Sequence, residues 1–167
     1  SAKGHPFLYY ATGAACTEVN VDRVTGSVTI ERVDILHDTG ASLNPALDIG
    51  QIEGGFVQGA GWLMSEELIW DHHGRLQTDS PATYKIPAIS DRPKALTISL
   101  LDRPNSEATV FHSKAVGEPP FMLATSVWCA IRDAISAVSG YRVSPKLEAP
   151  ATPERVLWAL RNSEERT

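Results

Sequence analysis

Residues 44–68 combine the pattern of a helix with an unusual number of glycines. Asn44 followed by Pro45 is a typical helix start, because Asn caps unpaired N–H groups and Pro fits the first turn. Apolar residues then recur at helical spacing, at Ile49, Ile52, Phe56, Ala60, Leu63 and Met64. Five glycines, at positions 50, 54, 55, 59 and 61, interrupt the segment, and each costs a helix about 1 kcal/mol relative to Ala. We therefore predict a long helix over residues 45–67 that something approaches closely.

Two explanations for these glycines remain open. Glycines four residues apart allow two buried helices to pack closely. Alternatively, the glycine surface faces a buried polar cofactor, to which Gln51 or Gln58 donates a hydrogen bond. The charged residues Asp48 and Glu53 exclude a membrane span here.

A second helix is predicted over residues 120–138, and residues 113–120, Ser-Lys-Ala-Val-Gly-Glu-Pro-Pro, lead into it. Glu118 precedes the helix start, where unpaired N–H groups and the helix dipole stabilise a carboxylate anion. Gly117 leaves one side of Glu118 open, and Lys114 adds a second charge nearby. Glu118 is either an acidic residue at a helix start or a catalytic carboxylate.

The rest of the chain alternates strands and turns. We predict strands over residues 7–22, 28–37, 95–101 and 108–112, and a short hairpin over 66–77. The apolar face of the second strand changes sides, which indicates a bulge near Glu31-Arg32. A short helix follows Thr152-Pro153, and the tail from residue 162 to 167 is expected to fray. The fold class is thus α+β, with mixed or antiparallel strands, two long helices and a short C-terminal helix, in a single unit of residues 1–167.

Asp38-Thr39-Gly40 resembles the Asp-Thr-Gly loop of aspartic proteases. Those enzymes need two such aspartates that share a proton, so one copy would act only in a homodimer. The alternative is an Asx-type turn at the end of a strand, with Gly40 at the tight bend.

Composition excludes several classes of protein. A net charge of −5 argues against nucleic acid or an anionic membrane as partner, and no run of 18 apolar residues indicates a membrane span. Cys16 and Cys129 form no disulfide framework, which favours a reducing cytoplasm. His72-His73 lies in a turn pattern rather than a ligand pattern, so no metal-ligating residues are predicted.

Several motifs in order resemble one family. Residues 113–120 resemble the loop that carries the catalytic glutamate of xanthine dehydrogenases, members of the molybdenum hydroxylase family. Residues 42–59 resemble the helix of that family that passes the molybdopterin, and residues 13–19 and 83–87 also have counterparts. The resemblance implies a fragment of the C-terminal molybdopterin-binding domain of a larger, molybdenum-binding subunit.

The resemblance also implies a chemistry, the hydroxylation of purines such as xanthine and hypoxanthine to urate. Glu118 would act as general base toward a Mo–OH group whose oxygen attacks an electron-poor C–H carbon. Hydride would pass to Mo=S, and electrons would leave through two 2Fe–2S clusters to FAD and NAD. Gln51, preceded by Gly50, matches a cofactor contact, and Lys114 and Gly117 are further candidates for binding the cofactor.

This chain contains no cluster cysteines, no flavin segment and no pterin-phosphate loop. We therefore expect it to be inactive and free of cofactor on its own. Its expected partners are the remainder of the molybdenum-binding subunit, the iron–sulfur and FAD parts, and the purine. Pro119-Pro120 is the xanthine dehydrogenase form of the motif. An aldehyde oxidase or another heterocycle hydroxylase is one alternative, and a non-catalytic interaction domain is the other.

Overall fold

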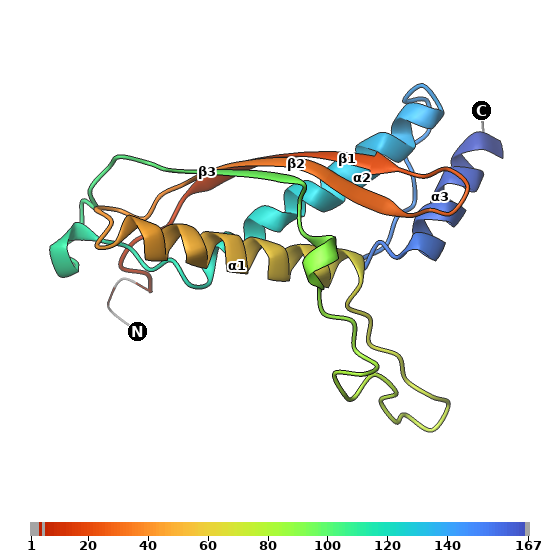
Figure 1. The fold of residues 1–167 in the computed structure, drawn as a ribbon, viewed down its shortest axis with the longest axis horizontal. Helices are drawn as coiled ribbons and strands as arrows, with labels where there is room; N and C mark the ends of the chain where they lie inside the picture. The colour runs from red at the N-terminus through yellow and green to blue at the C-terminus, as the bar shows by residue number, and fades with distance from the viewer. Residues whose placement is uncertain (1–3, 5, 166–167) are drawn as a thin grey trace.

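A three-stranded sheet organises the computed structural model, which describes residue 4 and residues 6–165. β1 (Gly13–Val21) and β2 (Val28–His37) are antiparallel, and β3 (Ala95–Leu100) joins β2 in parallel (Figure 1). Glu18 pairs with Arg32 and Val19 pairs with Ile30, so Glu31 is an extra residue in β2. The bulge predicted from the change of apolar face is therefore confirmed.

Helix α1 (Pro45–Met64) begins where the sequence predicts and ends three residues earlier than residue 67. The Asn44 side chain accepts a hydrogen bond from the Leu47 N–H at 3.3 Å, as expected of a cap. Ile52 and Phe56 are fully buried and pack into the common core with β2. The α+β fold class is confirmed.

The second predicted helix consists of two parts. Residues Pro119–Ala124 form a 3-10 helix, η3, and α2 (Thr125–Val138) continues from it. Val127, Ile131 and Ile135 are fully buried, and α2 lies against β1 and α1. By length and composition alone Pro119–Val138 is apolar enough to cross a membrane, but this buried row is part of the domain core.

The C-terminal helix α3 (Pro153–Glu165) is longer than predicted. The expectation of a frayed tail is wrong for residues 162–165, because Ser163 is buried and Glu164 forms an ion pair with Arg23. Residues 166–167 of that predicted tail lie outside the described residues.

Two predicted strand segments are also wrong. The first strand begins at Gly13 rather than residue 7, so residues 6–12 run outside the sheet. Residues 108–112 form no strand; Val110–His112 is a 3-10 turn, η2. Phe111 and His112 have φ angles of 48° and 57°, which no strand accommodates.

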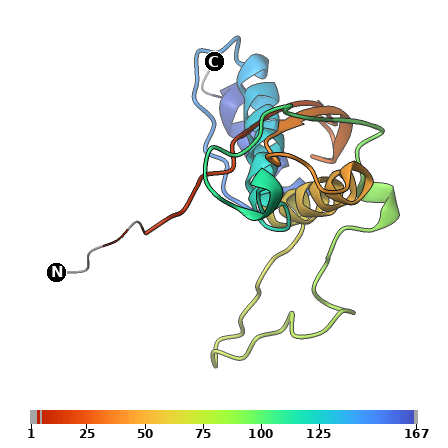
Figure 2. The same cartoon turned by 90° about the vertical axis from the view of Figure 1, so that its left-hand side faces the viewer.

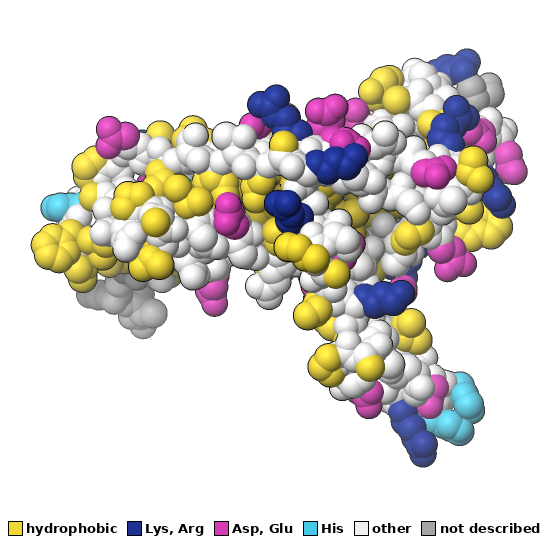
Figure 3. Space-filling model, viewed as in Figure 1, with side chains coloured by type: hydrophobic (Ala, Val, Ile, Leu, Met, Phe, Trp, Pro, Cys, Tyr) yellow, Lys and Arg dark blue, Asp and Glu magenta, His cyan; other side chains and the backbone are white. Residues whose placement is uncertain are grey.

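Residues 66–86 form an arm that projects from the rest of the molecule in both ribbon views, and residues 87–93 return beside α1 (Figures 1 and 2). The predicted hairpin is reduced to one bridge between Trp70 and Leu76. The Asp71 carboxylate closes the turn by accepting from the His73 and Arg75 N–H groups at 2.8 and 2.9 Å. A short 3-10 helix, η1 (Ile89–Asp91), returns the arm to β3. His72 and His73 are both exposed, and cyan histidine atoms lie at the end of the arm in Figure 3.

Candidate functional site

Helix α1 and the start of η3 are in direct contact through two glycines. A Cβ placed on Gly59 would lie 2.4 Å from the Phe121 carbonyl oxygen, and one on Gly55 would lie 3.3 Å from the Pro120 Cβ. Real side chains do not tolerate the first distance, so Gly59 is required for this approach. Close packing between helices, the first explanation for the glycines, therefore holds for this part of α1.

The same packing brings two predicted site segments together. A Cβ placed on Gly117 would lie 3.9 Å from the Gln51 Oε1 atom, so Gln51 lies beside the loop that carries Glu118. Both Gln51 and Glu118 are exposed. Residues far apart in the sequence thus share one surface, as the resemblance to the hydroxylase family implied.

Glu118 occupies the cap position of η3, but its carboxylate makes no capping hydrogen bond. Pro119 and Pro120 have no N–H groups, and the Phe121 N–H donates to the Glu118 carbonyl oxygen at 3.1 Å. The expectation that N–H groups of this helix stabilise the Glu118 anion is therefore wrong. Its carboxylate is exposed and makes no hydrogen bond to the described residues.

Lys114 directs its charge away from Glu118. Its ammonium Nζ donates to the Asp38 Oδ2 at 2.5 Å and to the Tyr10 carbonyl oxygen at 2.9 Å. The Lys114 side chain is 12% exposed and that of Asp38 is 4% exposed. The second charge predicted near Glu118 is thus neutralised by a buried partner from the end of β2.

Asp38 forms the predicted Asx-type turn. Its Oδ1 accepts from the Gly40 N–H at 3.0 Å, and Gly40 has a φ of 62°. Burial opposes the charge of Asp38, but hydrogen bonds from Lys114, from the Gly40 N–H and from the Thr12 hydroxyl outweigh it and hold its pKa below the usual value. A carboxylate already paired with lysine does not suit a proton-sharing protease dyad, and the aspartic protease alternative finds no support.

Beside Asp38, the imidazole of His37 is buried without a hydrogen-bond partner on either ring nitrogen. Burial lowers the pKa of His37, the Lys114 charge lowers it further, and Asp38 acts in the opposite direction. His112, in contrast, is a structural residue, since its Nδ1 lies 2.9 Å from the Asn105 carbonyl oxygen.

A second row of α1 is open. A Cβ placed on Gly50 or Gly54 would have no atom within 4 Å, and Gln58 next to them is exposed. Within residues 4 and 6–165, the side-chain amide groups of Gln51 and Gln58 have no hydrogen-bond partner. Glycines that permit close approach, with an amide donor beside them, fit a flat polar cofactor such as a pterin. No three His, Cys, Asp or Glu side chains among those same residues converge as metal ligands.

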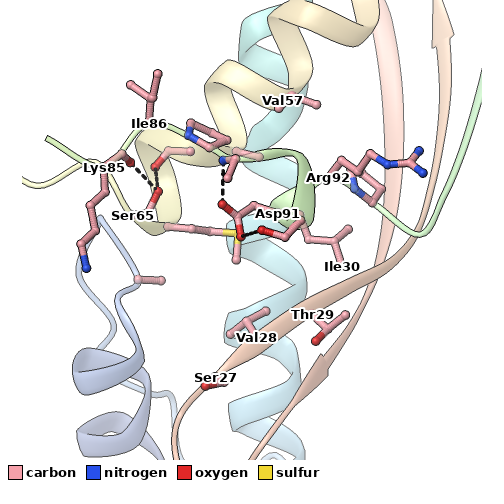
Figure 4. Close-up of a pocket in the computed structure, with 18 of the residues that line it drawn as sticks. Ser27, Val28, Thr29, Ile30, Val57, Ser65, Lys85, Ile86, Asp91 and Arg92 are labelled. Carbon is pink, nitrogen blue, oxygen red and sulfur yellow. Dashed lines mark hydrogen bonds between the residues drawn. The ribbon is translucent and has the colours of Figure 1, made fainter. Parts of the chain in front are cut away.

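A separate cavity of about 650 Å³ lies at the other end of α1 (Figure 4). It is bounded by the start of β2, by the second half of α1 from Val57 to Met64 with Ser65 after it, and by residues 81–94. Two of the polar groups that line it are partnered within the chain: the Ser65 hydroxyl donates to the Lys85 carbonyl at 3.0 Å, and Asp91 accepts from the Ala88 N–H at 2.8 Å. Neither Gln51 nor Glu118 lines it.

The structure brings the predicted residues Gln51, Gly117 and Glu118 together, but sequence reasoning missed the partners of Lys114. No local pattern joins Lys114 to Asp38, which lies 76 residues away, or Ala115 to the Tyr9 hydroxyl, which accepts from the Ala115 N–H at 2.9 Å. These contacts depend on how the end of β2 and the segment before β1 are placed beside the loop.

Comparison with known proteins supports a common origin. A family model described as a molybdopterin cofactor-binding domain matches residues 1–93. A xanthine dehydrogenase/oxidase of Gallus gallus is 52% identical over 92% of this chain, and aldehyde oxidase 1 of Bos taurus is 46% identical over 95%. The chain spans 12% of the length of each of these two relatives. The solved aldehyde oxidoreductase of Desulfovibrio gigas matches with a TM-score of 0.74 and 32% identity, over 93% of this chain and 16% of that one.

Proposed function

Since this chain belongs to the molybdopterin cofactor-binding domain family, we propose that it supplies one wall of a hydroxylase active site, with Glu118 as general base. The observation that carries the proposal is the position of Glu118. Its carboxylate is exposed and uncapped, and its loop lies against Gln51 and beside the open glycine row. The remaining walls, the iron–sulfur clusters and the FAD would come from other parts of a longer protein.

Gln51, Gly50 and Gly117 would hold the cofactor. The Gln51 amide offers two N–H donors and one acceptor, and the two glycines allow the backbone to approach a flat ring. Molybdenum on the pterin supplies the two-electron redox chemistry of the hydroxylation when it is bound. The Lys114 ammonium is instead directed to Asp38.

Glu118 would move one proton. Its carboxylate accepts, at an Oε atom, the proton that the attacking oxygen nucleophile loses as the new C–O bond forms. An exposed carboxylate without a hydrogen-bond partner among the described residues can turn toward that proton. General-base assistance of this kind is typically worth about 10²–10⁴-fold in rate.

We propose purines as the substrate class. The support is the Pro119-Pro120 form of the motif together with the 52% identity to a protein named xanthine dehydrogenase/oxidase. Aldehydes are the second candidate, supported by the 46% identity to an aldehyde oxidase. The ratio of kcat/KM for xanthine to that for an aromatic aldehyde, measured in the full-length protein, decides between the two.

Glu118→Gln in the full-length protein tests the base directly. Gln keeps the shape but accepts no proton, so turnover per bound molybdenum should fall about 10²–10⁴-fold. Glu154→Gln is a matched control, because Glu154 is likewise an exposed acidic residue near a helix start, in the first turn of α3. Retention of more than about a tenth of turnover by Glu118→Gln would show that Glu118 is not the base.

Gln51→Ala should behave differently from Glu118→Gln. Removing the amide takes away a cofactor contact but no proton acceptor, so molybdenum content should fall more than turnover per bound metal. Gln77→Ala is a matched control on the arm, which lies away from the site. Elemental analysis together with steady-state rates separates the two effects, and a normal molybdenum content in Gln51→Ala would remove Gln51 from the cofactor site.

A further inference from the structure

The backbone before Glu118 is fixed to the end of β2. The Lys114 N–H donates to the Thr39 carbonyl at 2.8 Å, and Ser113 forms a bridge with Gly40. The Ala41 N–H donates to the His112 carbonyl at 2.9 Å. Three successive residues of the loop, His112 to Lys114, are thus held by the turn that Asp38 begins.

The Asp38–Lys114 ion pair adds a side-chain connection between the same two segments. Lys114 reaches Asp38 at 2.5 Å, and Asp38 also accepts from the Thr12 hydroxyl at 3.2 Å and from the Gly40 N–H. Both charged side chains are almost completely buried. A buried ion pair is a weak source of net stability because both ions lose their hydration, but its geometry is strictly defined.

The loop is held in place as far as Val116 and is exposed from Gly117 onward. The Ala115 N–H donates to the Tyr9 hydroxyl at 2.9 Å, and Val116 is buried in the core. The next two residues, Gly117 and Glu118, are both exposed to solvent. The backbone that leads to Glu118 is therefore anchored from His112 to Val116, and the exposed Gly117 alone separates this anchored stretch from Glu118.

We propose that the Asp38–Lys114 ion pair positions Glu118, and that Lys114 is a positioning residue and not a contact of the cofactor. This inference rests on the proposed function of Glu118 as the base. A base must lie within hydrogen-bond reach of its proton, and a displacement of about 1 Å can cost about 10²-fold in rate. The pair, the turn and the Tyr9 hydroxyl together hold the loop within that tolerance.

Lys114→Met in the full-length protein removes the charge and keeps most of the apolar stem. We expect turnover per bound molybdenum to fall about 10–10²-fold, with molybdenum content and KM close to those of the wild type. Asp38→Asn/Lys114→Met should be no slower than Lys114→Met, because both changes break one interaction. Lys94→Met is the matched control, since Lys94 forms an exposed ion pair with Glu31 at the bulge of the same strand.

Two results would overturn the inference. Turnover per molybdenum within about twofold of the wild type in Lys114→Met would show that the pair does not position the base. Loss of molybdenum with unchanged turnover per bound metal would identify Lys114 as a cofactor contact. Should Lys114→Met fail to fold, Tyr9→Phe tests the same loop without an unpaired buried charge. Tyr10→Phe is its control, because Tyr10 is 70% exposed. Tyr9→Phe should lower turnover per molybdenum severalfold, and an unchanged value would contradict the inference.

Amide hydrogen exchange separates this inference from the proposed function. In Lys114→Met the hydrogen-bonded amides of Lys114 and Ala115 should lose protection, whereas Lys94→Met should leave them unchanged. Unchanged protection in Lys114→Met would overturn the positioning role whatever Glu118 does. If Glu118→Gln retained its turnover while exchange rose as expected, the proposed base would be wrong and the anchoring of the loop would stand.

Discussion

The two glycine rows of α1 have different surroundings. Gly55 and Gly59 lie against η3, close enough that a Cβ on Gly59 would overlap the Phe121 carbonyl oxygen. Gly50 and Gly54 lie on the adjacent row, and a Cβ added to either would meet no atom of the chain within 4 Å. The first row is explained by packing inside the domain, whereas the second has no reason within the described residues to lack side chains.

Glycines in a single helix can therefore be required for two different reasons. The packed row places η3, and with it Glu118, at a set distance from α1. The open row, with Gln51 and Gln58 exposed beside it, is the surface on which we propose the pterin. Substitutions that add one methyl group to each row should therefore have opposite effects on stability.

Gly59→Ala should have the largest effect on stability. The added methyl group meets a backbone oxygen, which moves only if η3 moves, and overpacking of this kind costs about 1–3 kcal/mol or more. The gain in helix propensity of about 1 kcal/mol offsets part of this cost. Because the approach of 2.4 Å is to a backbone atom, the overpacking cost lies at the upper end of this range, about 3 kcal/mol. We therefore expect a net loss of about 2 kcal/mol, or a lowering of Tm by roughly 4–8 °C, in thermal denaturation of the chain. An unchanged Tm would mean that η3 adjusts freely and that the packed row does not set the position of Glu118.

Gly54→Ala should instead raise the stability of the chain, by up to about 1 kcal/mol, because the methyl group meets nothing and the helix propensity improves. In the full-length protein the same change should lower molybdenum content, since the proposed cofactor surface gains a methyl group. A more stable protein with normal molybdenum content would contradict the assignment of the open row. Gly74→Ala on the arm is not a suitable control, because Gly74 has a φ of 76° and a side chain there would be strained. Ala82→Gly is used instead, to show how stability and molybdenum content respond to a change at an exposed site away from α1.

Local chemistry in the sequence accounts for the parts of the fold that were predicted correctly. Asn44-Pro45 marked the start of α1, and the change of apolar face in β2 marked the bulge at Glu31. The resemblance to the hydroxylase family, rather than spacing, led us to place Gln51 and Glu118 together, and their segments do lie side by side.

The remaining features depend on tertiary contacts that no window of sequence contains. Residues 108–112 alternate like a strand, but His112 is tied by its ring to the Asn105 carbonyl and takes a positive φ. Lys114 lies close to Glu118 in the sequence, yet its ammonium donates to Asp38, which directly follows the distant strand β2. The ending of α3 likewise followed from burial of Ser163, which the polar composition of residues 162–165 concealed.

Gly55→Ala should have the smallest effect, and it tests how sharply the packed row ends. Its Cβ would lie 3.3 Å from the Pro120 Cβ and 3.4 Å from the Phe121 nitrogen, so the neighbours need to yield by only a few tenths of an ångström. The overpacking cost and the propensity gain of about 1 kcal/mol should nearly cancel, leaving the free energy of unfolding within about 0.5 kcal/mol of the wild type in denaturant titrations. Because Pro120 is two residues from Glu118, turnover per molybdenum in the full-length protein is the more sensitive measurement, and we expect a decrease of only a few-fold. A loss of stability as large as that of Gly59→Ala would show that η3 is held rigidly along the whole row, and the position of Glu118 would then depend on Gly55 as much as on Gly59.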